Sequence, residues 1–155
     1  MFEYAAFHDA LVKVGKPMVY GIWSVGLGKE WAWANKLGHY WRTAGDLGNR
    51  WGQMEGEAGG AGVMYNYDIQ QAIPSIATIS KPGSFAFLDE LMVGQAPGIP
   101  HGAEDIGLTN EEAKTHFGIW CMMTSPLWLT HNIFDPPEGI HAVVTNRDAI
   151  AISQV

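Results

Sequence analysis

Short apolar runs that suit β-strands alternate with segments that suit helices along nearly the whole chain. Strict alternation favours a parallel sheet with helices outside it, because each parallel strand needs a crossover connection to reach its neighbour. We predict strands at 17–23, 39–46, 84–91 and 127–131. About four β/α units fit either a small open sheet or half of a closed barrel, and the pattern by itself does not choose between them.

Three helices have clear sequence signals. The first covers 2–14, where apolar residues recur at the spacing of one helical face. The second begins with Thr109 as N-cap and Glu112 three residues later, which together form a capping box. The third covers 146–152 and starts at an asparagine N-cap. The connection 49–79 is predicted to be irregular, with short helical pieces.

The composition indicates a globular chain and excludes several partners. At 155 residues the chain is shorter than the roughly 250 residues of a complete (β/α)₈ barrel. The net charge of −7 leaves no basic stripe for nucleic acid, and no apolar run approaches the ~18 residues of a membrane span. Cys121 is the only cysteine, so no internal disulfide is expected, and its apolar surroundings predict a buried thiol.

Polar side chains stand at the carboxyl ends of three predicted strands, where parallel α/β folds gather their active sites. Asp46 ends the second strand, Asp89 and Glu90 lie near the end of the third, and His131 ends the fourth. Two carboxylates that face each other across a pocket suit general acid/base or glycosyl-transfer chemistry. A carboxylate after a strand also commonly caps a helix or stabilises a turn, so Asp46 has two interpretations at this point.

The residues around Asp46 resemble a motif of the melibiase-type α-galactosidases, family 27 of the glycoside hydrolases. The segment YWRTAGDL at 40–47 is similar to the family's WRTTGDI. Three further segments resemble family motifs in the same order: KPGSFAFLDELMVG at 81–94, GLTNEE at 107–112 and TNRDAIAISQ at 145–154. The resemblance implies that the chain is the second half, strands five to eight, of a (β/α)₈ TIM barrel.

Position by position, the resemblance implies that Asp46 is the general acid/base of a retaining glycosidase that hydrolyses terminal α-D-galactosyl residues. It makes Arg42 and Asp89 substrate-binding candidates, and Trp23 and Trp41 are candidates to lie against a sugar face. No metal or cofactor is expected. Members of this family are commonly secreted or lysosomal and vacuolar, so the resemblance implies such a compartment.

The sequence departs from the family at the catalytic nucleophile. That residue is an aspartate in a K-x-D-x-C motif, which this sequence lacks. We therefore expect residues 1–155 to form a single partial catalytic barrel domain, without the first half of the barrel and the C-terminal β-sandwich. Such a chain by itself is expected to be inactive, and its open sheet edges favour self-association into homo-oligomers.

Two substitutions leave the sugar specificity open. Ser24 stands where the family has a glutamate that contacts the sugar, and Ala86-Phe87 replaces an Asn-Asp pair. The alternatives are a hydrolase of a related α-glycoside and a non-catalytic, carbohydrate-binding relative of the barrel. A further interpretation, a metal-dependent hydrolase that uses His101, Glu104 and Asp105, has no recognised ligand spacing.

Overall fold

The structure is a computed structural model that describes residues 1–52, 61–73, 79–100, 102–103 and 105–154. Its sheet has three parallel strands, β1 (Gly21–Ile22), β2 (Tyr40–Arg42) and β3 (Phe85–Phe87), in the order β1-β2-β3. The register pairs Trp41 of β2 with Ile22 on one side and Ala86 on the other. The predicted parallel arrangement is therefore present over its first three units, although each strand is shorter than the sequence predicts.

The fourth predicted strand, 127–131, does not form in the described chain. A single parallel bridge joins Leu129 to Leu91, and the Leu91 N–H donates to the Trp128 carbonyl at 2.7 Å. The Leu91 carbonyl, in turn, accepts the hydroxyl of Thr130 at 2.7 Å. The prediction of a fourth strand is wrong, because only the bridge between Leu91 and Leu129 forms in this part of the described chain.

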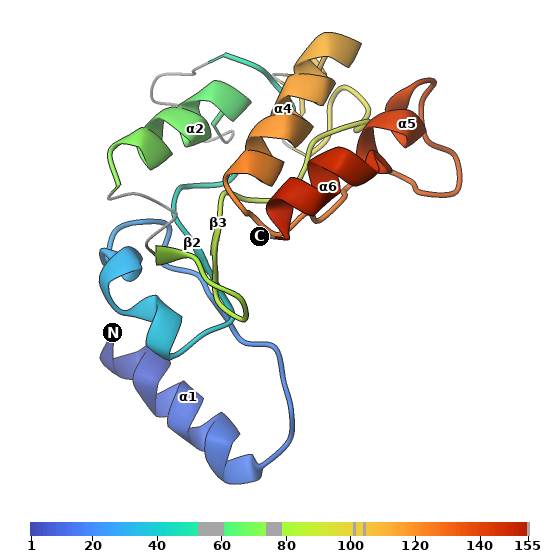
Figure 1. The fold of residues 1–155 in the computed structure, drawn as a ribbon. Helices are drawn as coiled ribbons and strands as arrows, with labels where there is room; N and C mark the ends of the chain where they lie inside the picture. Colours follow the sequence, from blue (N-terminus) through green and yellow to red (C-terminus); the bar gives the residue numbers. More distant parts are fainter. Residues whose placement is uncertain (53–60, 74–78, 101, 104, 155) are drawn as a thin grey trace.

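Helix α1 (Phe2–Val14) confirms the first predicted helix but not its expected packing. It ends at Gly15, whose φ of 71° is a left-handed conformation that favours glycine. None of its residues is buried, and Phe7 is 55% exposed although its ring lies 5.2 Å from that of Tyr20. In Figure 1, α1 projects from the end of the molecule opposite α4 and α6. The apolar face predicted for this helix therefore lies at the surface of the chain.

The C-terminal half supplies much of the buried core. Helix α4 (Asn110–Met122) begins with the predicted capping box, in which the Thr109 and Glu112 side chains each accept from the other residue's backbone N–H. The predicted apolar stripe of this helix is buried, including Phe117 and Trp120. Part of this stripe lies against the segment that follows β3, where Trp120 Nε1 donates a buried hydrogen bond to the Asp89 carbonyl.

Shorter helices complete the described fold. Helix α6 (Arg147–Ser153) packs against α4 and is capped by Asn146 as predicted, and α5 (Ile140–Val144) precedes it (Figure 1). Two short 3-10 helices, at Glu30–Ala32 and Ala34–Lys36, lie between β1 and β2.

Helix α2 (Val63–Gln71) lies between β2 and β3 in the sequence and is one of the helical pieces predicted for that connection. Its buried residues include the polar Asn66 and Gln70. These two side chains are four residues apart and therefore share one face of the helix. The helix consequently reaches the strand ends through hydrogen bonds as well as through apolar contact.

Candidate active site

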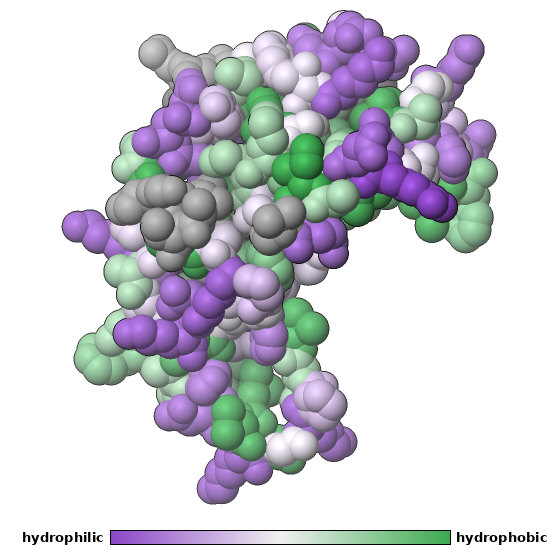
Figure 2. All heavy atoms as spheres, viewed as in Figure 1, coloured by the Kyte–Doolittle hydropathy of each residue, from purple (hydrophilic) through white to green (hydrophobic). Residues whose placement is uncertain are grey.

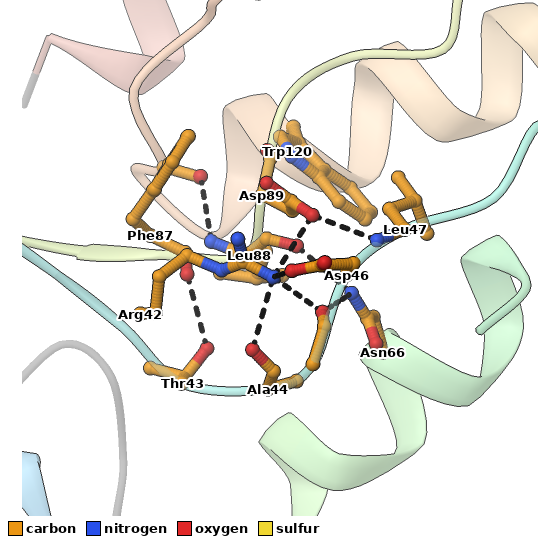
Figure 3. Close-up of polar contacts among 12 residues, drawn as sticks. Arg42, Thr43, Ala44, Asp46, Leu47, Asn66, Phe87, Leu88, Asp89 and Trp120 are labelled. Carbon is orange, nitrogen blue, oxygen red and sulfur yellow. Dashed lines mark hydrogen bonds and ion pairs between the residues drawn. The ribbon is translucent and has the colours of Figure 1, made fainter. Parts of the chain in front are cut away.

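Arg42 joins two strand ends at the carboxyl edge of the sheet (Figure 3). It is the last residue of β2, and its side chain is fully buried. One guanidinium nitrogen, Nη2, lies 2.9 Å from Oδ2 of Asp89 and 3.4 Å from Oδ1 of Asp46. The same nitrogen donates to the carbonyl oxygen of Ala44 at 3.1 Å and to that of Gly45. A single buried cation therefore holds the segment after β2 against the segment after β3.

The carboxylate of Asp46 faces solvent. Its side chain is 58% exposed, whereas the side chain of Asp89 is only 8% exposed. Among the described residues, no backbone N–H donates to the Asp46 carboxylate, and the adjacent Leu47 N–H donates to Asp89 at 2.7 Å instead. The turn-stabilising role that the sequence left open for Asp46 thus belongs to Asp89, and the Asp46 carboxylate is available to a ligand.

Asp89 is held in an unusual backbone conformation. Its φ of 90° lies in a region that residues other than glycine rarely adopt. Trp120 Nε1 donates to its carbonyl at 2.7 Å, while Arg42 and the Leu47 N–H bind its carboxylate. Burial raises the pKa of the Asp89 carboxyl, and Arg42 and the Leu47 N–H oppose that shift because they stabilise the anion. Such geometry, fixed by several partners, is typical of functional sites.

Glu90 adds a third carboxyl group beside this pair. It is partly buried, and burial raises its pKa, with a further increase from the negative charge of Asp89. Asp46, Asp89 and Glu90 line one pocket with a volume of about 190 Å³, together with Trp23 and Pro100. Carboxyl groups can accept hydrogen bonds from sugar hydroxyls, and an aromatic ring can pack against the apolar face of a sugar.

Trp23 covers the buried guanidinium of Arg42. Arg42 Cζ lies 4.2 Å from the centroid of the Trp23 ring and 5.9 Å from that of Phe87, so the cation is flanked by two aromatic rings. Trp23 itself is 57% exposed and keeps part of its surface at the pocket. Arg42 has no exposed surface, so it does not line the pocket directly, and its ion pairs hold Asp46 and Asp89 beside it.

Trp41 does not belong to the pocket, which corrects the expectation that it lies against a sugar. Its side chain has no exposed surface and is part of the core cluster that includes Ile22 and Ala86. Successive side chains of a strand point to opposite faces of the sheet. Because Arg42 points towards the site, its neighbour Trp41 points into the core.

Asn66 and Gln70 of α2 make hydrogen bonds to the segments at the strand ends, and the sequence signals do not identify them. Asn66 Nδ2 donates to the carbonyls of Gly45 and Leu88, each at 3.2 Å (Figure 3). Gln70 Nε2 donates to the hydroxyl of Thr43. The spacing of the two residues does indicate one helical face, but a polar pair at this spacing more commonly faces solvent. Only the packing of α2 identifies them as buried partners of the strand ends.

The other candidate residues lie elsewhere. His131 is buried, and its Nδ1 lies 2.8 Å from the Val93 carbonyl. Asp105 is buried, pairs with Arg50 at 3.3 Å and accepts the Asn49 N–H at 3.0 Å. The two residues proposed with Asp105 as metal ligands, His101 and Glu104, lie outside the described residues. Within the described part of the chain, no group of three or more His, Cys, Asp or Glu side chains is placed to hold a metal ion.

The cysteine has the environment that the sequence predicts. Cys121 is a buried free thiol in α4, and burial raises its pKa. A thiol with a raised pKa is mostly protonated at neutral pH and is a poor nucleophile. Cys121 therefore contributes packing.

Comparisons with known proteins agree with the motifs around Asp46. Residues 1–155 match the melibiase family model that is described as alpha galactosidase A. Alpha-galactosidase A of Cellvibrio japonicus is 32% identical over 153 residues, which cover 97% of this chain and 34% of that relative. The chain thus spans about a third of the length of the curated relatives that it matches over nearly all of its residues.

Solved structures show the same fold. An α-galactosidase of Saccharomyces cerevisiae, solved with raffinose, matches with a TM-score of 0.82 and 24% identity over 97% of this chain and 33% of that chain. A family 27 β-L-arabinopyranosidase of Geobacillus stearothermophilus matches with a TM-score of 0.76 and 18% identity, with the same coverage of 97% and 33%. At these identities the likeness concerns the fold alone. In the described residues, no helix is both long and apolar enough to cross a membrane.

Proposed function

Because this chain belongs to the melibiase family of α-galactosidases, we propose that it carries the general acid/base of a retaining α-galactosidase, and that this residue is Asp46. In a retaining mechanism this group protonates the departing glycosidic oxygen and later takes a proton from the attacking water. The observation that carries the proposal is the exposed carboxylate of Asp46 in a pocket that also contains Asp89 and Glu90.

The ion pairs of Arg42 suit a group that gains and loses a proton. Arg42 Nη2 lies closer to Asp89, at 2.9 Å, than to Asp46, at 3.4 Å. When Asp46 is protonated, Asp89 still neutralises the buried guanidinium, so the change of charge leaves no unpaired buried cation. Asp46 can therefore alternate between acid and base while its supporting residues stay in place.

We also propose that the chain is the second half of a (β/α)₈ barrel, and that the nucleophile belongs to the first half. A retaining mechanism needs a second carboxyl about 5–5.5 Å from the acid/base, and Asp89 is already engaged with Arg42 and the Leu47 N–H. Exposed apolar side chains support the proposal, because the other half of a barrel would provide surface to cover them. Val19 is 75% exposed and Phe134 is 92% exposed. Figure 2 shows such hydrophobic surface both near α1 and near α5.

The substrate that we propose is a terminal α-D-galactosyl residue of an oligosaccharide. The curated relatives named as α-galactosidases support this assignment. The fold is shared with a protein named as a β-L-arabinopyranosidase, so the fold by itself is compatible with more than one sugar. The choice between sugars depends on the side chains that line the pocket.

One observation favours a second candidate, a carbohydrate-binding relative without hydrolysis or a hydrolase of a related α-glycoside. Ser24 provides no carboxylate after β1, and Trp23 and Phe87 place aromatic rings on both sides of Arg42. These side chains reduce the number of charged groups that reach a sugar.

The test of the primary proposal is Asp46→Ala in the complete protein that contains this chain. Loss of the acid slows hydrolysis of substrates with poor leaving groups by about 10²- to 10⁴-fold. An aryl α-galactoside with an acidic leaving group still reacts in the first step, because its leaving group needs no proton. Added azide then accelerates turnover and yields α-galactosyl azide, since azide attacks the glycosyl-enzyme without a general base.

Asp135→Ala is the matched control, because Asp135 is an exposed aspartate outside the pocket. It should leave the kinetics unchanged. Wild-type kinetics in Asp46→Ala would remove the assigned role. If the complete wild-type protein binds an α-galactoside without hydrolysing it, and Trp23→Ala abolishes that binding, the second candidate is correct.

A further inference from the structure

The amino-terminal ends of the strands surround a second, larger pocket. Its volume is about 420 Å³, and it lies at the opposite end of the sheet from Asp46. Its walls come from the segments that precede the three strands, within 16–20, 35–39 and 81–84. His8 and Leu11 of α1 also line it. The pocket is therefore separate from the candidate active site.

Three lysines line this pocket, which is unexpected in an acidic chain. Lys16, Lys36 and Lys81 are half of the six lysines in a protein of net charge −7. All three are exposed, and none has an ion-pair partner among the described residues. Asp9 directly follows the lining residue His8 in the sequence. Its side chain is 81% exposed, and its Oδ1 lies 3.3 Å from Nδ1 of His8. Unpaired ammonium groups of like charge repel one another, and a bound anion relieves that repulsion.

His39 adds a directed hydrogen-bond donor to the same pocket. Its Nδ1 accepts the backbone N–H of Tyr20 at 2.9 Å, so the neutral ring carries its hydrogen on Nε2. His39 is exposed, lines the pocket and directly precedes β2. The pocket thus combines three point charges with a donor whose tautomer is set by the backbone.

We propose that this pocket binds a small molecule with a multivalent oxyanion group, a phosphate or a polycarboxylate. Three lysines match a ligand charge of two or more, because ammonium groups bind phosphate and carboxylate as point charges. The volume of about 420 Å³ exceeds that of an inorganic ion and falls in the range of small-molecule sites. The inference is independent of the proposed glycosidase activity, since it uses none of the residues around Asp46.

The test is a titration of the 155-residue chain with inorganic phosphate and with citrate, at constant ionic strength kept with sodium chloride. Calorimetry gives the dissociation constants, and amide NMR shifts identify the site. We expect saturable binding with shifts concentrated at Gly38, His39, Gly83 and Ser84. In the triple variant Lys16→Gln/Lys36→Gln/Lys81→Gln, affinity should fall by about tenfold or more.

The matched control is Lys13→Gln/Lys29→Gln/Lys114→Gln, which removes the same charge from lysines outside the pocket. Its affinity should stay within about twofold of the wild type. Equal losses in the two triple variants, or shifts that never saturate, would show a general charge effect and overturn the proposal. If the pocket triple variant does not fold by circular dichroism, Lys81→Gln and Lys114→Gln are compared in its place with the same criteria.

Discussion

At the scale of single residues, one amide side chain links the two strand ends that carry the candidate carboxylates. Asn66 is fully buried, and its Nδ2 donates to the carbonyls of Gly45 and Leu88, the residues that directly precede Asp46 and Asp89. The separation between the two carboxylates therefore depends on a residue that touches neither of them.

We expect Asn66→Ala to lower the free energy of unfolding by about 1–3 kcal/mol, because it leaves the Leu88 carbonyl without its donor and removes one of the two donors to the Gly45 carbonyl. Urea denaturation monitored by tryptophan fluorescence measures this change. Asn132→Ala is the control, since Asn132 is exposed and its side chain accepts the Phe134 N–H at 3.1 Å. A loss for Asn66→Ala no larger than that of the control would contradict the linking role.

His116 gives the fold a specific dependence on pH. Its ring is fully buried against Trp120, and Nε2 accepts the Met92 N–H at 3.1 Å. Burial lowers the pKa of His116 from 6.5 to about 3. Between these two values the unfolded chain binds a proton that the folded chain excludes, so this contribution to stability is complete above pH 6.5 and is lost as the pH falls towards 3.

The variant His116→Gln isolates this effect, because glutamine keeps an acceptor for the Met92 N–H but does not titrate. We expect the difference in unfolding free energy between wild type and variant to change by up to about 1.4 kcal/mol per pH unit between pH 6.5 and 3, in favour of the variant at low pH. Denaturation series across that range measure it. A difference that does not vary with pH would show that folding does not lower the pKa of His116.

At the scale of elements, the start of α4 is better defined by the sequence than the ends of the strands. The Thr109 hydroxyl accepts the Glu112 N–H at 3.3 Å, and the Glu112 carboxylate accepts the Thr109 N–H at 2.8 Å. Both bonds join residues three positions apart, so the sequence alone contains the full signal for the start of this helix. Strand ends depend instead on partners that are tens of residues away.

Thr109→Ala is expected to destabilise the fold by about 1 kcal/mol, because the N-cap acceptor is lost. Thr115→Ala provides a matched control in the same helix, where the hydroxyl bonds the Glu111 carbonyl within the helix. Alanine has high helix propensity, so the control should change stability by no more than about 0.5 kcal/mol. Thermal denaturation of both variants makes the comparison, and equal effects would exclude a specific capping contribution.

At the scale of the whole molecule, several large apolar side chains lie at the surface and outside the core. Val19 precedes the edge strand β1, and Phe134 lies in the connection before α5, where Figure 2 also shows hydrophobic surface. Unpaired strand edges and apolar patches of this kind favour association with another chain.

We expect the 155-residue chain to self-associate in sedimentation velocity at micromolar concentrations. Val19→Lys and Phe134→Lys, combined, should shift it towards the monomer, because charges at an edge and in an apolar contact oppose association. Ile106→Lys adds a charge at a loop position that is also 75% exposed and serves as the control. A monomeric wild-type chain, or an equal shift in the control, would contradict association through these surfaces.

Local sequence patterns identify the α/β alternation, α1, the capped helix α4, the Asn146 cap and the motif that contains Arg42 and Asp46. Each of these signals lies within a few consecutive residues, so it can be read without knowing what lies nearby in space. Within this motif, Nη2 of Arg42 lies 3.4 Å from Oδ1 of Asp46.

Contacts between distant segments select which of these residues line the pocket beside Asp46. Trp41 is buried in the core, and the Trp23 ring packs against the guanidinium of Arg42. The Asp89 carboxylate accepts the Leu47 N–H, and Asn66 donates to the Gly45 carbonyl. The strand expected at 127–131 is reduced to one bridge, between Leu91 and Leu129. In each case the outcome depended on a contact between distant segments, and the free energy of such a contact depends on packing and burial that no local pattern encodes.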